Sequence, residues 1–206
     1  SPYNSRNHEY YSEDAVLTSG QAVAFISGGK EYGVIIAPKH LAFNDTEINR
    51  TGVSVFMTEQ QARENELRGT QAAIEDAGAL GVMTAFNRVG ITAANAHTGL
   101  LKNILRGEWG FKGLESQDFI MNPNYAVLKE YALNGGTMTT FTGENTMAAV
   151  SEKFAYWTTE NVGQDTELMS AIKQAMTWQA YALANSNALD GMASSTRLVS
   201  VRTWYD

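Results

Sequence analysis

One carboxylate stands where it could take part in a reaction. Asp118 ends a short β-prone run that begins at Leu114. Because side chains alternate along a strand, Leu114, Ser116 and Asp118 share one face, and Glu115 and Gln117 share the other. A carboxylate at the carboxyl end of a strand can act as a nucleophile or as a base. The structural alternative is an aspartate that only caps the turn that follows.

Two adjacent hydrogen-bond donors follow the apolar run 33–37. Lys39 offers three N–H donors and His40 up to two, a combination suited to neighbouring sugar hydroxyls. Taken singly, an exposed lysine and a core histidine are the structural alternatives. The polar run 44–50 comes next and could extend the site. The structural alternative for this run is a solvated loop with one weak Glu–Arg ion pair. We therefore treat residues 39–50 as a second candidate segment of a site.

Several kinds of chemistry lack their usual residues. The chain has no cysteine, and His8, His40 and His97 show no paired metal-ligand spacing. Gly-x-Gly-x-x-Gly, Gly-Lys-Ser/Thr and Gly-x-Ser-x-Gly motifs are absent from the sequence, which argues against nucleotide binding and a serine-hydrolase elbow. We expect no cofactor and no metal.

The composition excludes further classes of partner. The 206 residues include 15 Lys+Arg and 22 Asp+Glu, so the formal net charge is −7. A broad phosphate-binding face is not expected, and neither is nucleic acid as a partner. No run approaches the ~18 apolar residues of a membrane span. With 44% hydrophobic and 18% charged residues, we expect a packed globular core.

Strand-like and helix-like segments alternate along the chain. Thr58 and Gln61 have the spacing of a capping box, and Asn122-Pro123 has the form of an N-cap and N1 pair. Strands are predicted at 33–37, 82–86, 114–118 and 137–141, and helices at 15–27, 58–76, 100–107, 122–133 and 168–183. Such alternation predicts a parallel sheet covered by helices, with right-handed crossovers.

Two architectures fit this order, a doubly wound open sheet and part of a (β/α)8 barrel. A whole barrel takes ~250 residues and eight strands, about twice the strands predicted here. The opening residues 1–4 include no Met and no signal-peptide regions, so we expect a cut or mature end. Residues 142–164 are expected to form a long loop and 185–206 a C-terminal tail.

The residues also resemble a known family. The matching stretches are 6–14, 39–50, 82–88, 105–113, 116–119 and 185–191. In this order they are similar to the barrel domain of glycoside hydrolase family 3, of the β-glucosidase type. The resemblance implies an α/β fold, the C-terminal half of a (β/α)8 TIM-like barrel with about four βα units.

The resemblance also implies roles for single residues. Asp118 matches the family's nucleophile, which forms a covalent glycosyl-enzyme in a retaining mechanism. Arg6, Lys39 and His40 match residues that bind hydroxyls of the non-reducing terminal sugar. Phe119 is expected to form an aromatic wall for that sugar.

The residues around this site include supports and departures from the family pattern. Glu47 and Arg50 are expected to support the Lys39–His40 loop. Phe86, also placed at the substrate, stands where many members have Tyr, so a hydrogen bond to the nucleophile would be lost. The polar Glu115 and Gln117 would need partners in the helix layer. Residues 41–44 replace the Pro-Gly-His-Gly segment of members that cleave N-acetylglucosamine, which disfavours that branch.

The implied substrate is a small β-glucoside or oligosaccharide with a terminal β-D-glucosyl residue. The family's first barrel strands and its second α/β domain, which holds the general acid/base, would lie outside this chain. The expected partner is thus the remainder of the same enzyme. The alternatives are a β-xylosidase or another exo-glycosidase of the family, and a non-catalytic carbohydrate-binding or structural fragment. A weaker option is another (β/α)8 hydrolase or an aldolase with Lys39 as Schiff base.

Overall fold

A parallel sheet forms the centre of the computed structural model, which describes residues 4–120, 127–140, 155 and 157–189. Strands β1 (Lys39–Leu41), β3 (Gly81–Thr84) and β6 (Leu114–Gln117) pair in the order β1-β3-β6, all parallel. A further parallel bridge joins Ser116 to Met138 and so marks a fourth position. The predicted α/β class and partial barrel are confirmed.

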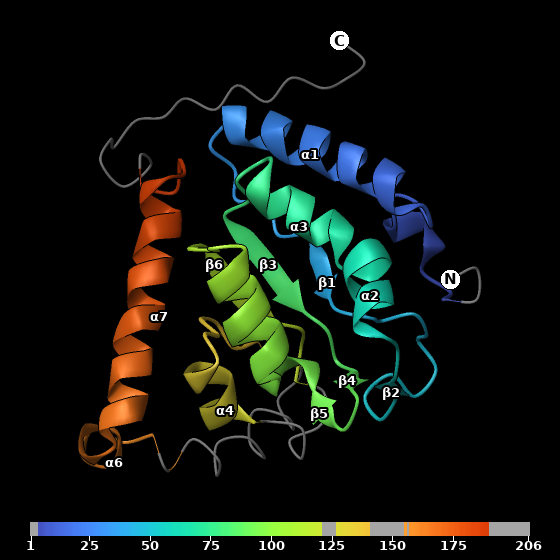
Figure 1. Ribbon diagram of the computed structural model, residues 1–206. Coiled ribbons are helices and arrows are strands. Elements are labelled where there is room, and N and C mark those ends of the chain that lie inside the picture. The colour runs from blue at the N-terminus through green and yellow to red at the C-terminus, as the bar shows by residue number, and fades with distance from the viewer. Residues whose placement is uncertain (1–3, 121–126, 141–154, 156, 190–206) are drawn as a thin grey trace.

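Helices cover the sheet (Figure 1). They are η1 (Asn7–Glu9), α1 (Ala15–Glu31), α2 (Glu59–Gln61), η2 (Ala62–Glu66), α3 (Arg68–Glu75), η3 (Ala94–Ala96), η4 (Gly99–Glu108), α4 (Leu128–Leu133), α6 (Thr159–Gln164) and α7 (Thr166–Ala184), where η marks 3-10 and π turns. A small second sheet, absent from the predictions, has the order β2 (Ser54–Val55), β4 (Arg88–Val89), β5 (Thr92–Ala93). Among the described residues, no helix combines the length and the apolar character needed to cross a bilayer.

The main core lies between the sheet and helices α1, α3 and η4. Val82 of β3, Ala73 of α3 and Leu101 of η4 are almost fully buried there. Helices α1 and α3 approach closely at Gly69, where an added Cβ would lie 2.6 Å from Cγ2 of Thr18. The absence of a side chain at this position therefore sets how closely the two helices pack.

The first predicted strand was placed wrongly. Residues 34–38 are not in a ladder, and β1 comprises Lys39–Leu41 instead. The N–H of Met83 donates to the Pro38 oxygen, and that of Ala85 donates to the Leu41 oxygen. Pairing with β3 therefore begins where the apolar run ends, and the run itself packs around Gly81. This shift places the candidate donors within the strand itself.

The predicted long loop is also wrong at its C-terminal end. Residues 159–164 form α6, and the Thr158 side chain accepts the Asn161 N–H at 3.2 Å. Asp165 then caps α7 by accepting the Leu168 N–H at 3.0 Å. Two adjacent side-chain caps thus order a stretch that its polar composition marked as a loop. The predicted Asn122 cap, most of the loop and the tail beyond 189 lie outside the described residues.

Helix α7 is confirmed, but its predicted apolar face is only partly buried. Leu168, Ala175 and Ala182, seven residues apart, are the buried positions. Met176 is 63% exposed and Leu183 37% exposed, although both were expected on the inner face. Small alanines at the contact positions bring α7 against α4 and β6, so the contact stripe is narrower than the apolar stripe of the sequence.

Candidate active site

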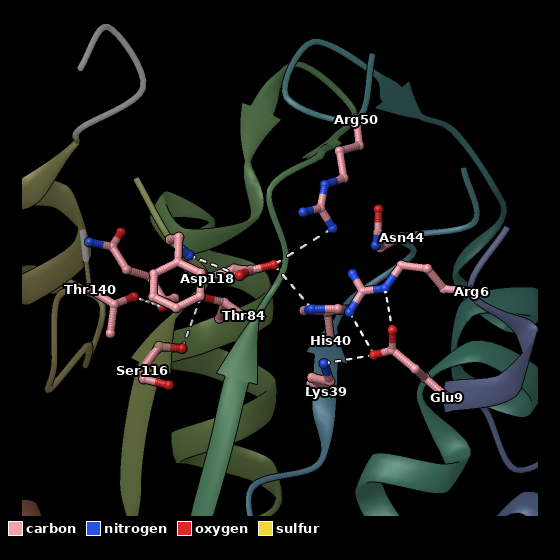
Figure 2. Close-up of polar contacts among 12 residues, drawn as sticks. Arg6, Glu9, Lys39, His40, Asn44, Arg50, Thr84, Ser116, Asp118 and Thr140 are labelled. Carbon is pink, nitrogen blue, oxygen red and sulfur yellow. Dashed lines mark hydrogen bonds and ion pairs between the residues drawn. The ribbon is translucent and has the colours of Figure 1, made fainter. Parts of the chain in front are cut away.

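The candidate residues meet at the carboxyl ends of the parallel strands (Figure 2). Asp118 follows β6 directly, and its N–H donates to the Thr84 oxygen at the end of β3 at 3.0 Å. On the other side of β3, Lys39 and His40 belong to β1. The hydrogen bonds between the strands therefore fix the main chain of Asp118, Lys39 and His40 relative to one another.

Asp118 and His40 form a buried contact. His40 Nε2 lies 3.0 Å from Asp118 Oδ2, and the two side chains are 3% and 7% exposed. The Phe119 N–H donates to Asp118 Oδ1 at 2.8 Å, and Arg50 Nη1 lies 4.0 Å from Oδ2. Burial raises the pKa of the Asp118 carboxyl, but His40, the Phe119 N–H and Arg50 together lower it below its usual value. The carboxylate is therefore ionised at neutral pH.

The turn-capping alternative describes only one of the two Asp118 oxygens. Oδ1 accepts the N–H of the next residue, as a capping aspartate would. Oδ2 instead faces His40 and Arg50, which come from a different part of the chain. The carboxylate thus has a tertiary environment of donors and positive charge, which a turn alone would not require.

Lys39 and Arg6 are joined by a residue that the sequence predictions missed. Glu9 Oε2 lies 2.8 Å from Lys39 Nζ and 2.6 Å from Arg6 Nη2, and Glu9 Oε1 accepts Arg6 Nε at 2.8 Å. The available signal was the spacing of three between Arg6 and Glu9, which places the pair on adjacent sides of one turn. The bond to Lys39 spans 30 residues and could not be read locally.

Glu47 links Arg6 to Arg50, which lies beside Asp118. It lies 3.4 Å from Arg6 Nη1 and 3.1 Å from Arg50 Nη1, and it accepts the Asn44 side-chain amide at 3.1 Å. Glu47 thus contacts Arg6 and Arg50 rather than Lys39 or His40. Arg50 in turn points at Asp118, so it belongs to the site itself (Figure 2).

The two predicted aromatic residues differ in setting. The Arg50 guanidinium lies over the Phe86 ring, with its Cζ atom 4.5 Å from the ring centroid. Phe86 therefore holds that cation by a cation–π contact. Phe86 has no hydroxyl, so it donates nothing to Asp118. Phe119 is 45% exposed beside the carboxylate, which leaves its ring accessible to a ligand.

Glu115 and Gln117 lie away from this group. Gln117 Oε1 accepts the Asn95 amide at 2.6 Å, so one of its polar atoms has the partner we expected it to need. The Glu115 side chain is fully buried beside the Arg106 charge and Tyr131. Burial raises the pKa of Glu115 to about 7.

The described residues offer no metal cluster, and the groove that they form lies away from the candidate site. The described residues contain no cluster of three or more His, Cys, Asp or Glu side chains placed to hold a metal. A groove of 590 Å³ lies between the small sheet and η4, lined mainly by apolar side chains such as Val55, Met57 and Leu100. None of the predicted site residues lines that groove.

Parallel strands under helices, with a buried carboxylate among donors at their carboxyl ends, define part of a (β/α)8-type domain. The model of the family "Glycosyl hydrolase family 3 N terminal domain" matches residues 1–132, more than half of the chain. The chain therefore belongs to glycosyl hydrolase family 3. The family resemblance drawn from the sequence is confirmed.

Named relatives agree with this assignment. A probable beta-glucosidase J of Emericella nidulans is 40% identical over 118 residues, covering 57% of this chain and 14% of the relative. A beta-glucosidase of Rhizobium radiobacter is 39% identical over 116 residues, covering 56% of this chain and 14% of the relative. The chain thus spans about one seventh of these relatives.

Solved structures match over most of the chain. Beta-glucosidase 3B of Thermotoga neapolitana, in complex with glucose, has a TM-score of 0.79 and 26% identity, covering 92% of this chain and 26% of that one. A beta-glucosidase of Paenibacillus barengoltzii has a TM-score of 0.76 and 26% identity, covering 91% and 21%. The fold described above is therefore that of one portion of such enzymes.

Proposed function

We propose that this chain supplies the nucleophile-bearing half of the barrel in a retaining β-glucosidase. One observation carries the proposal: the buried, ionised Asp118 carboxylate lies 3.0 Å from His40 and faces Arg50 at the carboxyl ends of the strands. The names of the relatives, and the glucose bound to one solved neighbour, support a glucosyl substrate.

Asp118 acts as the nucleophile in this proposal. A carboxylate oxygen attacks the anomeric carbon as the bond to the leaving oxygen breaks, and a general acid protonates that oxygen. Water, deprotonated by the same group, then releases the sugar from Asp118 with retained configuration. We assign the acid/base to a part of the enzyme outside this chain and nominate no glutamate here.

The surrounding side chains bind the sugar. Lys39, His40 and Arg6 donate to hydroxyls of the terminal glucosyl residue, and these bonds strengthen as positive charge develops on the ring. His40, then the Phe119 N–H and finally the Arg50 charge lower the pKa of the attacking carboxylate and keep it ionised. The exposed ring of Phe119 forms an apolar wall for one face of the sugar.

The remainder of the enzyme is the partner in this proposal. The chain covers 14% of the curated relatives' length, and within the described residues β1 pairs on one side only, with β3. A barrel needs strands on both sides of each strand. The other strands and the acid/base would therefore come from sequence beyond the half described here.

The proposal is tested by trapping the covalent intermediate. Residues 1–132 replace the equivalent stretch of the Rhizobium radiobacter enzyme, and the chimera is incubated with a 2-fluoro-β-glucoside bearing a good leaving group. Peptide mass spectrometry should find one 2-fluoroglucosyl group on Asp118, and none in the Asp118→Asn chimera. Label on a different residue, or an active chimera without label, would overturn the assignment.

A further inference from the structure

We propose that Glu9 is a positioning residue that holds Lys39 and Arg6 together as one paired donor for two hydroxyls of the bound sugar. This inference rests on the proposed function, because it concerns how that site grips its substrate. The sequence alone predicts no role for Glu9, because the residue enters the site only through its tertiary contacts.

The geometry of the bridge is unusual in that one oxygen atom serves both cations. Lys39 Nζ and Arg6 Nη2 lie 2.8 Å and 2.6 Å from the same Glu9 Oε2. Glu9 Oε1 accepts Arg6 Nε at 2.8 Å, which makes the arginine contact bidentate and fixes the plane of the guanidinium. Lys39 and Arg6 are therefore held next to each other with little freedom.

The carboxylate is needed because two cations would otherwise repel. Lysine and arginine side chains are long and flexible, and like charges at this spacing move apart in water. The bonds from Arg6 and then Lys39 lower the pKa of Glu9 well below its usual range, so the bridge stays charged at neutral and mildly acidic pH. Only an anion that reaches both nitrogens can keep the pair together.

The main chain under Glu9 is anchored to the loop that carries the rest of the site. The Glu9 N–H donates to the Arg6 oxygen at 2.9 Å, closing the η1 turn. The side chains of Asn4 and Tyr10, on either side of that turn, both donate to the Asn44 main-chain oxygen, at 2.6 and 3.1 Å. The bridge is thus part of a fixed frame rather than a mobile surface ion pair.

The bridge leaves the two donors accessible to a ligand. The Lys39 side chain is 41% exposed and that of Arg6 20%. Nζ carries two further N–H donors once Glu9 has accepted one. We infer that the pair binds neighbouring hydroxyls of a pyranoside, and that Glu9 itself contributes by fixing the positions of Lys39 and Arg6.

A double-mutant cycle in the chimera tests this role. In Glu9→Gln, an amide replaces the anion and turns N–H groups toward cations, so kcat/KM for 4-nitrophenyl β-glucoside should fall about tenfold, mostly through KM. In a Lys39→Met background the same substitution should cost less than about twofold, because one of the two bridged cations is already gone. A general structural effect would instead be equal in both backgrounds.

Matched controls separate the possible outcomes. Glu59 also bonds an arginine, at 2.8 Å, but lies on α2 with its side chain 77% exposed, so Glu59→Gln should leave kcat/KM unchanged. Glu9→Asp keeps the charge, but its shorter side chain cannot reach both cations. If Glu9→Gln lowers the unfolding temperature, the same double-mutant cycle is carried out with Glu9→Asp in its place. An unchanged kcat/KM, or equal losses with and without Lys39, overturns the role of Glu9. If Asp118 still takes the 2-fluoroglucosyl label, the proposed function survives that failure.

Discussion

Opposite charges alternate through the site, and this alternation explains how so many ionic side chains share a small space. Glu9 and Glu47 each separate two cations, and the series ends where Arg50 faces Asp118. Each cation has a carboxylate within 3.4 Å, so the donors keep their positions without a bound ligand. Such order reduces the cost of arranging the site when a substrate binds.

A second buried carboxyl, Glu115, lies outside that series and gives the fold a dependence on pH. Burial raises its pKa to about 7 in the folded state, against ~4.3 when unfolded. The folded protein therefore binds an extra proton between those values, and its stability falls as pH rises through that window. Burial also lowers the pKa of neighbouring Arg106, to about 10, and raises that of Tyr131, so neither titrates there.

We predict that Glu115→Gln removes this loss of stability. Glutamine has nearly the same shape and stays neutral, so above pH 7 the variant should be more stable than the parent, by on the order of 3 kcal/mol. Thermal unfolding of the chimera at pH 5 and pH 8 measures the difference. The exposed Glu75→Gln serves as control, and an unfolding midpoint of Glu115→Gln that keeps the parent's pH dependence would refute the prediction.

Among the structural elements, the contact between α1 and α3 determines how the helices lie over the sheet. Gly69 of α3 faces the Thr18 side chain of α1, so a larger residue must displace that side chain or push the helices apart. By contrast, Gly20 of α1 has nothing within 4 Å of an added Cβ. Substitutions at Gly69 therefore test the packing between the two helices, whereas substitutions at Gly20 test helix propensity alone.

Gly69→Leu should destabilise the fold by ~1–3 kcal/mol through overpacking. Gly20→Ala should stabilise it by ~0.5–1 kcal/mol, because alanine loses less backbone entropy in a helix and meets no neighbour. Chemical denaturation of the two chimeras gives both free energies of unfolding. If Gly69→Leu is as stable as the parent, the close approach of the helices is not required.

The elements that could be predicted from the sequence are those with strong local signals. Strand β3 is mostly apolar and begins at Gly81, β6 begins directly after Gly113, and Thr58 caps its helix as its spacing indicated. The strand at 33–37 failed because ladder pairing is decided by the neighbouring strand rather than by hydrophobicity alone. Helix α6 failed because its caps are polar residues, which are equally typical of loops.

The candidate site divides in the same way. Asp118 directly follows β6, and Lys39 and His40 follow an apolar run, so residue type and position could be judged together even though both donors lie within β1, and the structure brings His40 to Asp118. Glu9 escaped prediction because its bond to Lys39 depends on how the η1 turn packs against β1. Local sequence carries no information about that packing, whereas the strand ends converge in any parallel sheet.

At the scale of the whole molecule, the exposed apolar surface of α1 indicates where more of the enzyme would pack. Val16 is 80% exposed, Leu17 52% and Phe25 59%, all on the helix that also packs against α3. Large apolar residues gathered on one surface element are typical of an interface. In a (β/α)8 barrel each helix packs between two neighbours, and α1 has α3 on one side.

We therefore predict that the 206-residue chain alone hydrolyses no 4-nitrophenyl β-glucoside, whereas the chimera that carries residues 1–132 does. The isolated chain would hold the nucleophile and its sugar-binding donors, but the general acid and the strands beyond β1 would be missing. Release of 4-nitrophenol, followed by absorbance at equal protein concentrations, measures both, with the Asp118→Asn chimera as the blank. Turnover by the isolated chain above that blank would contradict the prediction and would require an acid within these 206 residues. If the chimera turns over the substrate and the isolated chain does not, the general acid and the remaining barrel strands are supplied by the Rhizobium radiobacter part of the chimera.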